Sequence, residues 1–381
     1  MIKKLDLVKI RKELHQIAEV SEKEKNTAQY ILNILKKFPF TEINTQVGGN
    51  GILAIIKGSK EHPSTLFRAE LDALPITEIN TFEHKTLTPN VSHKCGHDGH
   101  MTILLGLIEE IFKENTTTGT TYFLFQPAEE NGVGAKAVLN DLNKFNIKPD
   151  YAFALHNIPG FNSNEVFCKA QEITPAVVSI KVSIKGKTAH AAEPENGTNP
   201  SLAISDFIRF CDDLQVNDKS SDDFLVLTPI HINMGEIAYG ISAGEGEVHY
   251  TIRCWNNLKI KETKNKIESF LAKLSIDRKI SISFDYLEEF HSNQNNSECV
   301  EFIKQASEIN DIKYNNMSSP FKWGEDFGIF TDKFKGALFG LGAGMDTPSL
   351  HNPDYDFPDH LTESGIQMFK SIWEIIQKKK N

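Results

Sequence analysis

Residues 93–112 read His-Lys-Cys-Gly-His-Asp-Gly-His-Met-Thr-Ile-Leu-Leu-Gly-Leu-Ile-Glu-Glu-Ile-Phe. The first eight residues hold four side chains that can bind a metal, and from Met101 onward the apolar residues recur with a helical period. The stretch predicts a loop that enters a helix, where backbone N–H groups and the positive helix end favour an anionic ligand such as a thiolate. The Cys-x-His spacing is not that of a zinc knuckle, and no second close ligand pair occurs elsewhere. We therefore expect further ligands from distant loops, as in catalytic metal sites.

This stretch lies among short apolar segments that predict β-strands. Strands are expected over residues 51–57, 64–70, 120–126 and 151–155, and a helical pattern precedes them over residues 6–38. Strands that alternate with helices favour an α/β layered catalytic domain with a mostly parallel sheet. Open α/β sheets bind ligands at the carboxyl ends of their strands, and the candidate residues follow these strands in sequence.

The pattern changes at about residue 174. Strands are expected over 176–185, 224–234, 247–255 and 280–290, and helices over 199–214 and 259–274. The order β-α-β-β-α-β is that of a ferredoxin-like α+β unit. After residue 291 the helix-then-strand pattern of the first domain returns. We expect a catalytic domain made of residues 1–173 and 291–381, interrupted by a smaller inserted domain of residues 174–290.

The amino-acid composition indicates which partners the protein can bind and in which cellular compartment it is expected. The chain has 381 residues, 40% of them hydrophobic and 24% charged, and a net charge of −10, which argues against nucleic acid and anionic membranes as partners. No apolar run approaches the roughly 18 residues that span a bilayer, and the N-terminus does not resemble a secretory signal. Five scattered cysteines, at positions 95, 168, 211, 254 and 299, favour free thiols in a reducing cytoplasm.

Three further loops carry residues that could act on a substrate or bind a metal. Glu129 and Glu130 follow the strand at 120–126, so one could bind metal while the other serves as a general base. Taken alone, such a pair is more often a solvated pair at a helix start. His156 ends an apolar strand and alone would be a core or edge histidine. His351 lies in a turn-rich loop and alone would be a surface residue.

Together these loops supply five candidate ligands: Cys95, His97, Glu130, His156 and His351. Two divalent ions about 3.5–4 Å apart need five or six protein ligands with one shared, so the number fits a dinuclear site. Mixed nitrogen, oxygen and sulfur ligands favour Zn²⁺ or Mn²⁺, with Co²⁺ or Ni²⁺ also suitable, over Mg²⁺ and Ca²⁺.

From Leu14 to the C-terminus the chain resembles the Cys-containing amidohydrolase branch of the dinuclear metallopeptidase/aminoacylase clan. Hippurate hydrolases, auxin-conjugate hydrolases and N-acetyl-diaminopimelate deacetylases belong to this branch. Six ordered motifs carry the resemblance, at residues 68–75, 93–100, 126–130, 186–192, 324–327 and 349–356.

The resemblance implies specific roles. The five candidate ligands would bind two metals, Glu129 would be the general base, and the inserted domain would act as a lid and form a homodimer in which His190 reaches the partner's site. Because the five ligands suffice, we expect His93 and His100 to have supporting roles beside them. Other support would come from Asp72, Asp98, Glu325 and Asp326.

The chain departs from the family pattern in several places. Glu70, Lys94 and Met101 stand where Asp, Ala and Thr are usual, and Gly240 stands where the family has an Asn associated with substrate binding. Gly240 leaves the metal ligands intact but leaves the substrate preference open. We expect Arg253, on the strand at 247–255, to bind a substrate carboxylate through its planar fork; alternatively it is an ordinary surface arginine of the lid.

The resulting hypothesis is a metal-dependent amidohydrolase. A metal-bridged hydroxide, generated with Glu129 as base, would attack the amide of an N-acyl amino acid or a related small amide, and His190 would help to stabilise the oxyanion. A dipeptidase of the same clan is the main alternative. A non-catalytic binding protein on this scaffold is disfavoured, because a binder has no use for a free base beside two metals.

The sequence disfavours three other functions. The Gly-x-Ser-x-Gly sequence at 240–244 is followed by a strand pattern instead of the helix of a serine-hydrolase elbow. The glycines at 340–344 lack the context of a dinucleotide site. A redox-sensing role for Cys95 lacks an evident resolving cysteine.

Overall fold

The computed structural model describes residues 4–114 and 117–380, which divide into two compact units. Unit 1 consists of Met1–Ile173, Asn293–Ser318 and Glu325–Asn381, and unit 2 of Thr174–Ser292 and Ser319–Gly324. The chain therefore leaves unit 1 after Ile173, forms most of unit 2, and returns at Asn293 to complete unit 1.

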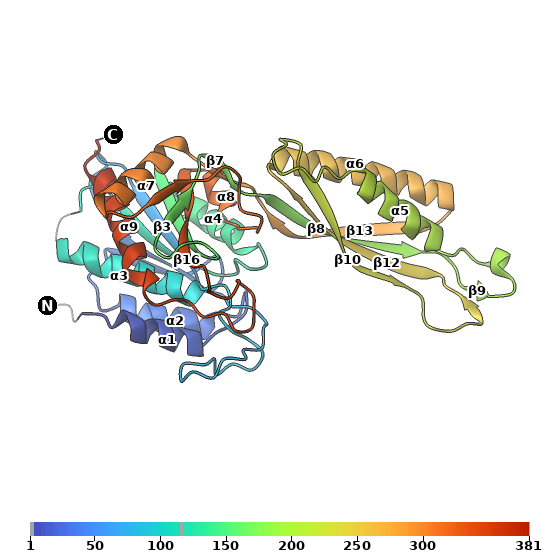
Figure 1. The fold of residues 1–381 in the computed structure, drawn as a ribbon, viewed down its shortest axis with the longest axis horizontal. Helices are drawn as coiled ribbons and strands as arrows, with labels where there is room; N and C mark the ends of the chain where they lie inside the picture. The colour runs from blue at the N-terminus through green and yellow to red at the C-terminus, as the bar shows by residue number, and fades with distance from the viewer. Residues whose placement is uncertain (1–3, 115–116, 381) are drawn as a thin grey trace. The chain divides into compact units, whose positions relative to one another are not determined.

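Unit 1 is built on an eight-stranded sheet (Figure 1). Its central neighbours β4, β3, β5 and β16 run parallel, whereas β2 is antiparallel to β1 and β4, and β6 is antiparallel to β16. This confirms the predicted mostly parallel α/β sheet; the short strands β1, β6 and β15 were not predicted. In spatial order the strands are β1 (Glu42–Val47), β2 (Gly51–Ile56), β4 (Thr121–Gln126), β3 (Thr65–Glu70), β5 (Tyr151–Pro159), β16 (Lys335–Gly344), β6 (Val166–Cys168) and β15 (Tyr314–Asn316).

Helices cover the sheet because its central strands are apolar on both faces; every residue of β2 and β3 is buried. The largest core cluster joins Phe67, Phe123 and Phe153 of the sheet to one group of helices. That group is α1 (Leu7–Gln16), α2 (Lys25–Leu35), α3 (His97–Glu114), α7 (Ser297–Ile309) and α9 (Leu361–Gln377). Outside this cluster, α4 (Gly134–Lys144) and α8 (Gly328–Thr331) also contact the sheet, and β7 (Gln171–Thr174) pairs with β14 (Asn293–Asn295). The helical pattern predicted over 6–38 is two helices joined by a loop.

Unit 2 has the predicted ferredoxin-like topology. Its four strands are all antiparallel in the order β10-β12-β8-β13, and both long helices lie on one face of the sheet (Figure 1). Alternate residues of β8, among them Val178 and Ile180, pack with Phe207 and Leu271 of the helices. The elements are β8 (Ala176–Lys185), α5 (Ser201–Asp213), β10 (Leu225–Met234), β12 (Glu245–Cys254), α6 (Asn257–Arg278) and β13 (Ser281–Phe290), with the short β9 (Ala189–His190), η1 (Pro194–Asn196) and β11 (Ile241–Ser242).

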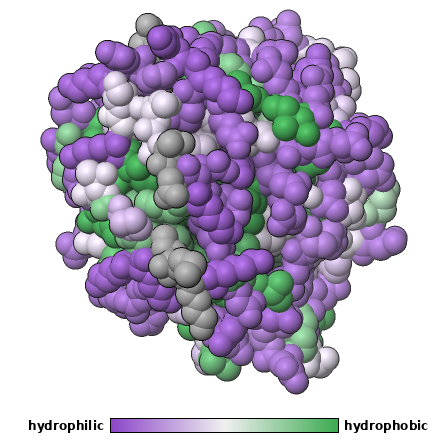
Figure 2. All heavy atoms as spheres, turned by 90° about the vertical axis from the view of Figure 1, so that its left-hand side faces the viewer, coloured by the Kyte–Doolittle hydropathy of each residue, from purple (hydrophilic) through white to green (hydrophobic). Residues whose placement is uncertain are grey.

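The two glycine-rich stretches that were disfavoured as nucleophile or dinucleotide motifs lie next to strands. Gly240 is followed by β11 and β12, and residues 340–344 belong to β16, so neither glycine-rich stretch leads into a helix. Within residues 4–114 and 117–380 there is no helix of the length and apolarity that crossing a bilayer requires. The face of unit 1 in Figure 2 is mostly hydrophilic, with hydrophobic residues in small groups.

Candidate metal centre

The candidate ligands of unit 1 come from the carboxyl ends of its parallel strands. Asp72 follows β3 by two residues, Glu129 and Glu130 follow β4, and His156 lies in the second half of β5. The loop after β16 carries His351, and α3 begins at His97, as the loop-to-helix prediction for this stretch required. The neighbouring parallel strands β4, β3, β5 and β16 therefore direct these loops to one edge of the sheet.

The five predicted ligands form two overlapping groups. Ligand atoms of Cys95, His97 and His156 lie within 4.8 Å of one another, and so do those of Cys95, Glu130 and His351. Cys95 Sγ is 3.5 Å from His156 Nε2, and Glu130 Oε2 is 3.7 Å from His351 Nε2. Cys95 is common to both groups, and Glu130 and His97 also form a third group with Glu129. His351 is the most accessible of the five, with 52% of its side chain exposed.

Hydrogen bonds fix which ring nitrogen two of the histidines present. His97 Nδ1 lies 2.8 Å from the carbonyl oxygen of Asp72, and His156 Nδ1 lies 2.9 Å from that of Asn157. A carbonyl oxygen only accepts, so each Nδ1 carries a proton and each Nε2 can bind a metal. In contrast, His100 engages Glu70 with Nδ1 at 2.7 Å and Asn157 with Nε2 at 2.6 Å, which leaves neither nitrogen for a metal.

Several buried polar atoms of this cluster lack a hydrogen-bond partner among the described residues. They are Nε2 of His97, Oε1 of Glu130 and Oδ1 of Asp72. A buried acceptor without a partner normally costs about 1–3 kcal/mol, so such atoms call for an explanation. A divalent cation would satisfy the Nε2 and Oε1 atoms, because both are ordinary metal ligands. The donor set therefore fits a metal.

Electrostatics in the cluster also favour a cation. Burial, together with the Glu325 and Glu130 carboxylates, raises the pKa of Glu129, and burial raises the pKa of the Cys95 thiol beside Glu130 and Glu129. Burial alone would lower the pKa of His97, but the hydrogen bond to Asp72 and the nearby carboxylates raise it to about 10. Several carboxylates thus lie close together, and their mutual repulsion favours a positive charge among them. A metal cation bound to His97 Nε2 would supply that charge in place of the proton on this nitrogen.

The predicted supporting residues Glu325 and Asp326 both contact a buried arginine, Arg68. Arg68 Nη2 lies 3.0 Å from Glu325 and 2.5 Å from Asp326, and Arg68 Nη1 contacts Glu70. Asp326 Oδ2 also accepts from Gln126 Nε2 and from the Ala135 N–H, both at 2.8 Å. Asp326 therefore holds both ends of the loop that carries Glu129 and Glu130.

A second ionic network includes Lys94 and Asp98, which flank Cys95 in the sequence. Asp98 Oδ2 is 2.8 Å from His15 Nδ1, and Glu78 Oε1 is 3.0 Å from His15 Nε2 and 2.5 Å from Lys94 Nζ. Sequence reasoning placed Asp98 near the site but assigned no role to His15, Glu78 or Lys94. His15 and Asp98 are 83 positions apart, and Lys94 and the Tyr355 carbonyl are 261 apart, so no local pattern could have revealed these contacts. The guanidinium of Arg11, 3.6 Å from Asp98, already supplies a cation to this group.

The other two predicted site residues belong to unit 2. His190 lies in β9 and is exposed, and its Nδ1 accepts a hydrogen bond from the Ala192 N–H at 3.1 Å. The remaining ring proton is therefore on Nε2. Arg253 lies in β12 and donates from Nη1 to the Lys322 carbonyl at 2.9 Å, and no carboxylate of the described chain forms an ion pair with it.

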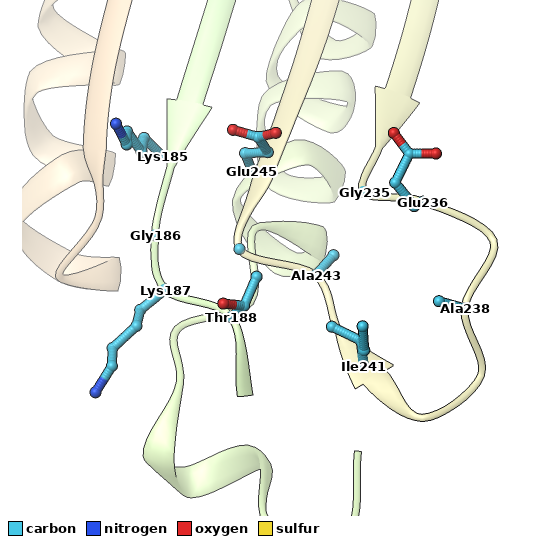
Figure 3. Close-up of a pocket in the computed structure, with 11 residues that line it drawn as sticks. Lys185, Gly186, Lys187, Thr188, Gly235, Glu236, Ala238, Ile241, Ala243 and Glu245 are labelled. Atoms are coloured by element: carbon cyan, nitrogen blue, oxygen red, sulfur yellow. The ribbon is translucent and has the colours of Figure 1, made fainter. Parts of the chain in front are cut away.

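Unit 2 also has a pocket of about 510 Å³ between the turn after β8 and the segment that joins β10 to β12 (Figure 3). None of the predicted site residues lines it. Its walls are mainly backbone, small side chains and a few charged groups, including Lys187, Glu236 and Glu245.

Comparison with known proteins identifies the family. The model of peptidase family M20/M25/M40 matches residues 66–375, and the chain belongs to this family. Peptidases hydrolyse amide bonds, so the predicted enzyme class and the predicted clan are both confirmed.

Relatives and a solved structure agree with this assignment. The chain is 30% identical to the N-acetyldiaminopimelate deacetylase of Bacillus velezensis over 92% of this chain and 94% of the relative. It is 27% identical to that of Lactobacillus helveticus over 96% of each chain. The fold resembles that of the Bacillus subtilis YXEP protein, a dinuclear metal binding peptidase of the M20 family, with a TM-score of 0.82, 22% identity and 98% coverage of each chain.

Proposed function

We propose that this member of peptidase family M20/M25/M40 is an amidohydrolase that removes the acyl group from small N-acyl amino acids. The observation that carries the proposal is the pair of ligand groups that share Cys95, with a further carboxylate, Glu129, beside them. The deacetylase relatives support an acyl amide as the bond that is cleaved.

Cys95, His97, Glu130, His156 and His351 would hold two divalent ions. The mixed sulfur, nitrogen and oxygen donors favour Zn²⁺ or Mn²⁺, and Co²⁺ or Ni²⁺ would also fit. The description of the YXEP protein as dinuclear supports the number two. Ions bound here would polarise the amide carbonyl and make a water more acidic.

Glu129 is the carboxylate that can move protons. Its Oε2 is 3.9 Å from His97 Nε2. Glu129 forms a third group with His97 and Glu130 but, unlike Glu130, is absent from the two groups above that contain Cys95. Glu129 takes a proton from the attacking water and returns it to the leaving nitrogen, which must be protonated before the C–N bond breaks.

His190 and Arg253 would bind the substrate from unit 2. The His190 Nε2–H group is a hydrogen-bond donor, as the oxyanion of a tetrahedral intermediate requires. Arg253 has a half-buried guanidinium whose recorded partner is one carbonyl group, so it remains available for a substrate carboxylate.

We infer a homodimer in which His190 acts in the partner's site. In unit 2, β10 is an edge strand, and the segment that follows it exposes Ile237 by 92% and Tyr239 by 96%. Unpaired edges and exposed apolar groups favour association with another chain. The five cysteines are all free and buried, which supports the cytoplasm as compartment.

Metal analysis combined with a substrate screen tests the proposal. The purified protein should hold close to two divalent ions, lose activity on chelation, and regain it with Zn²⁺ or Mn²⁺. N-acetyl and N-benzoyl amino acids should be hydrolysed faster than dipeptides. A metal-free protein with full activity would overturn the metal assignment. Hydrolysis of dipeptides alone would instead favour the dipeptidase alternative.

A further inference from the structure

The loop between α1 and α2, residues 17–24, contacts both segments that carry the site carboxylates. It lies before every motif that indicated function in the sequence, and nothing in the sequence assigned it a role. Four hydrogen bonds connect it to residues 72–73 and 128–131. They are Ala73 N–H to Glu19 O (2.8 Å), Ser21 Oγ to Asp72 Oδ2 (2.7 Å), Ala128 N–H to Glu24 Oε1 (2.9 Å) and Asn131 Nδ2 to Glu22 Oε1 (3.0 Å).

Glu24 is the most deeply placed member of this loop. It is fully buried, and its carboxylate accepts three hydrogen bonds. Oε1 accepts from the N–H groups of Glu22 and Ala128, at 2.8 and 2.9 Å, and Oε2 accepts from Asn50 Nδ2 at 2.9 Å. The carboxylate therefore joins three separate segments of unit 1 through donors alone.

The side chain of Glu24 does not serve the helix that it precedes. Glu24 is the N-cap residue of α2, but its side chain makes no capping hydrogen bond. Glu19 satisfies that helix end instead, because its Oε2 accepts from the N–H groups of Asn26 and Thr27 at 2.8 and 2.9 Å. A purely structural role in helix α2 therefore leaves the orientation of Glu24 unexplained.

The residue that Glu24 binds has an unusual backbone. Ala128 has φ of 53°, in the left-handed region that alanine rarely adopts, and it immediately precedes Glu129. Its carbonyl accepts from the Gly134 N–H at 2.9 Å, so both polar backbone groups of Ala128 are held. Such conformations persist only where the surroundings enforce them, and they occur frequently at active sites.

We propose that Glu24 is a positioning residue for Glu129: its hydrogen bond to the Ala128 N–H holds the left-handed turn that directs the Glu129 carboxylate toward the metal cluster. The proposal rests on the proposed role of Glu129 as the base. Loss of the bond lets Ala128 relax toward an ordinary backbone conformation, which rotates the following peptide and moves Glu129. Glu130 has a separate anchor, because its own N–H donates to Asp72 Oδ2 at 3.0 Å. Metal binding should therefore depend less on Glu24 than proton transfer does.

The test compares Glu24→Ala with Glu19→Ala, a matched carboxylate of the same loop whose side chain caps α2. Glu24→Ala should lower kcat for the best N-acyl amino acid by roughly 10–100-fold, with KM and bound metal nearly unchanged. Glu24→Gln, whose amide oxygen can still accept the Ala128 N–H, should recover part of the loss. Glu19→Ala should lower the melting temperature and leave the kcat of the folded enzyme unchanged.

A second substitution tests the backbone argument. Glycine adopts positive φ without the alanine penalty, so Ala128→Gly should make the loss caused by Glu24→Ala smaller. An equal loss in both backgrounds, or a fall in bound metal that matches the fall in kcat, would overturn the proposal. The Glu129→Gln variant distinguishes a wrong role for Glu24 from a wrong role for Glu129. If that variant is inactive while Glu24→Ala keeps full kcat, only the role of Glu24 fails; if Glu129→Gln is active, the assignment of the base itself fails.

Discussion

The predicted site residues of unit 1 and those of unit 2 differ in how completely their surroundings hold them. In unit 1, Cys95 and His97 are buried. The carbonyl oxygens of Asp72 and Asn157 hold the rings of His97 and His156 through hydrogen bonds. In unit 2, His190 is exposed and Arg253 has a single recorded backbone partner. The candidate ligands are therefore preorganised, whereas His190 and Arg253 have fewer contacts within their unit, as residues proposed to meet a substrate would. The variants below test this difference.

The largest effect is expected from Glu129→Gln. Replacing the proposed base should lower kcat by about 10²–10⁴-fold. The bound metal should change little, because Glu129 is not among the five proposed ligands. Glu130→Gln is the matched variant and should lower metal occupancy, as measured by elemental analysis. The reverse pattern would mean that the two neighbouring carboxylates have exchanged roles.

His190→Ala should lower kcat by about 10²–10³-fold, the usual effect of removing one oxyanion donor. Because the proposed donor acts across a dimer, mixing His190→Ala subunits with Glu129→Gln subunits should restore part of the activity. Each hybrid dimer would contain one complete site. If hybrids form, as native mass spectrometry can verify, and no activity returns, then His190 does not act in the partner's site.

Arg253→Ala should lower kcat/KM by roughly 10–100-fold for substrates with a free carboxylate, because a charge-assisted bidentate contact is lost. The amide of the same substrate has no charge to lose and should be affected little. Steady-state kinetics on such a pair measure the difference. Equal losses on acid and amide would show that Arg253 does not bind the carboxylate.

The smallest effect is expected on the stability of unit 1, at the buried residue His15. Burial alone would lower the pKa of His15, but hydrogen bonds to Asp98 and Glu78 raise it to about 9, above its ordinary value of 6.5. The protonated ring therefore stabilises the fold fully below pH of about 6.5, and this contribution is lost as pH rises through about 9. It amounts to at most about 3 kcal/mol.

Urea denaturation at pH 6.5 and 9.5 measures this contribution. His15→Gln should remove most of the pH dependence of the free energy of unfolding in this range. His231→Gln, at an exposed position of unit 2, is the control and should leave that dependence intact. An unchanged pH dependence in His15→Gln would show that other groups cause it.

Sequence patterns predicted four strands of the main sheet, the long elements of unit 2 and the five candidate ligands that come together, but not the contacts that hold those ligands. The strand at 176–185 has the predicted limits, because its alternating apolar residues cover one face of a sheet. The five ligand candidates meet because parallel strands end at one edge. In contrast, β6 and β15 have three residues each, too few to establish a period. The contacts of Lys94 and Arg68 join residues up to 261 positions apart, which no local pattern encodes.

The departures from the family pattern illustrate this limit. In the sequence, Lys94 was only an unusual residue beside Cys95. In the fold its Nζ contacts Glu78, Asn80 and the carbonyl oxygen of Tyr355, and its own carbonyl accepts from the His351 N–H at 2.8 Å. Lys94 thus links the loops of two candidate ligands, Cys95 and His351, and this link can be recognised only once both loops are located.

The pairing of β7 with β14 has a consequence for how such a protein can evolve. These strands carry the chain out of unit 1 and back into it, and they are neighbours in a two-stranded sheet. An insertion whose ends emerge side by side interrupts the host domain without disturbing its main sheet. Apart from Ser319–Gly324, unit 2 is one continuous segment of the chain, Thr174–Ser292. A single insertion or replacement can therefore change almost all of it. Selection can therefore change unit 2 while the candidate metal ligands of unit 1 are inherited unchanged.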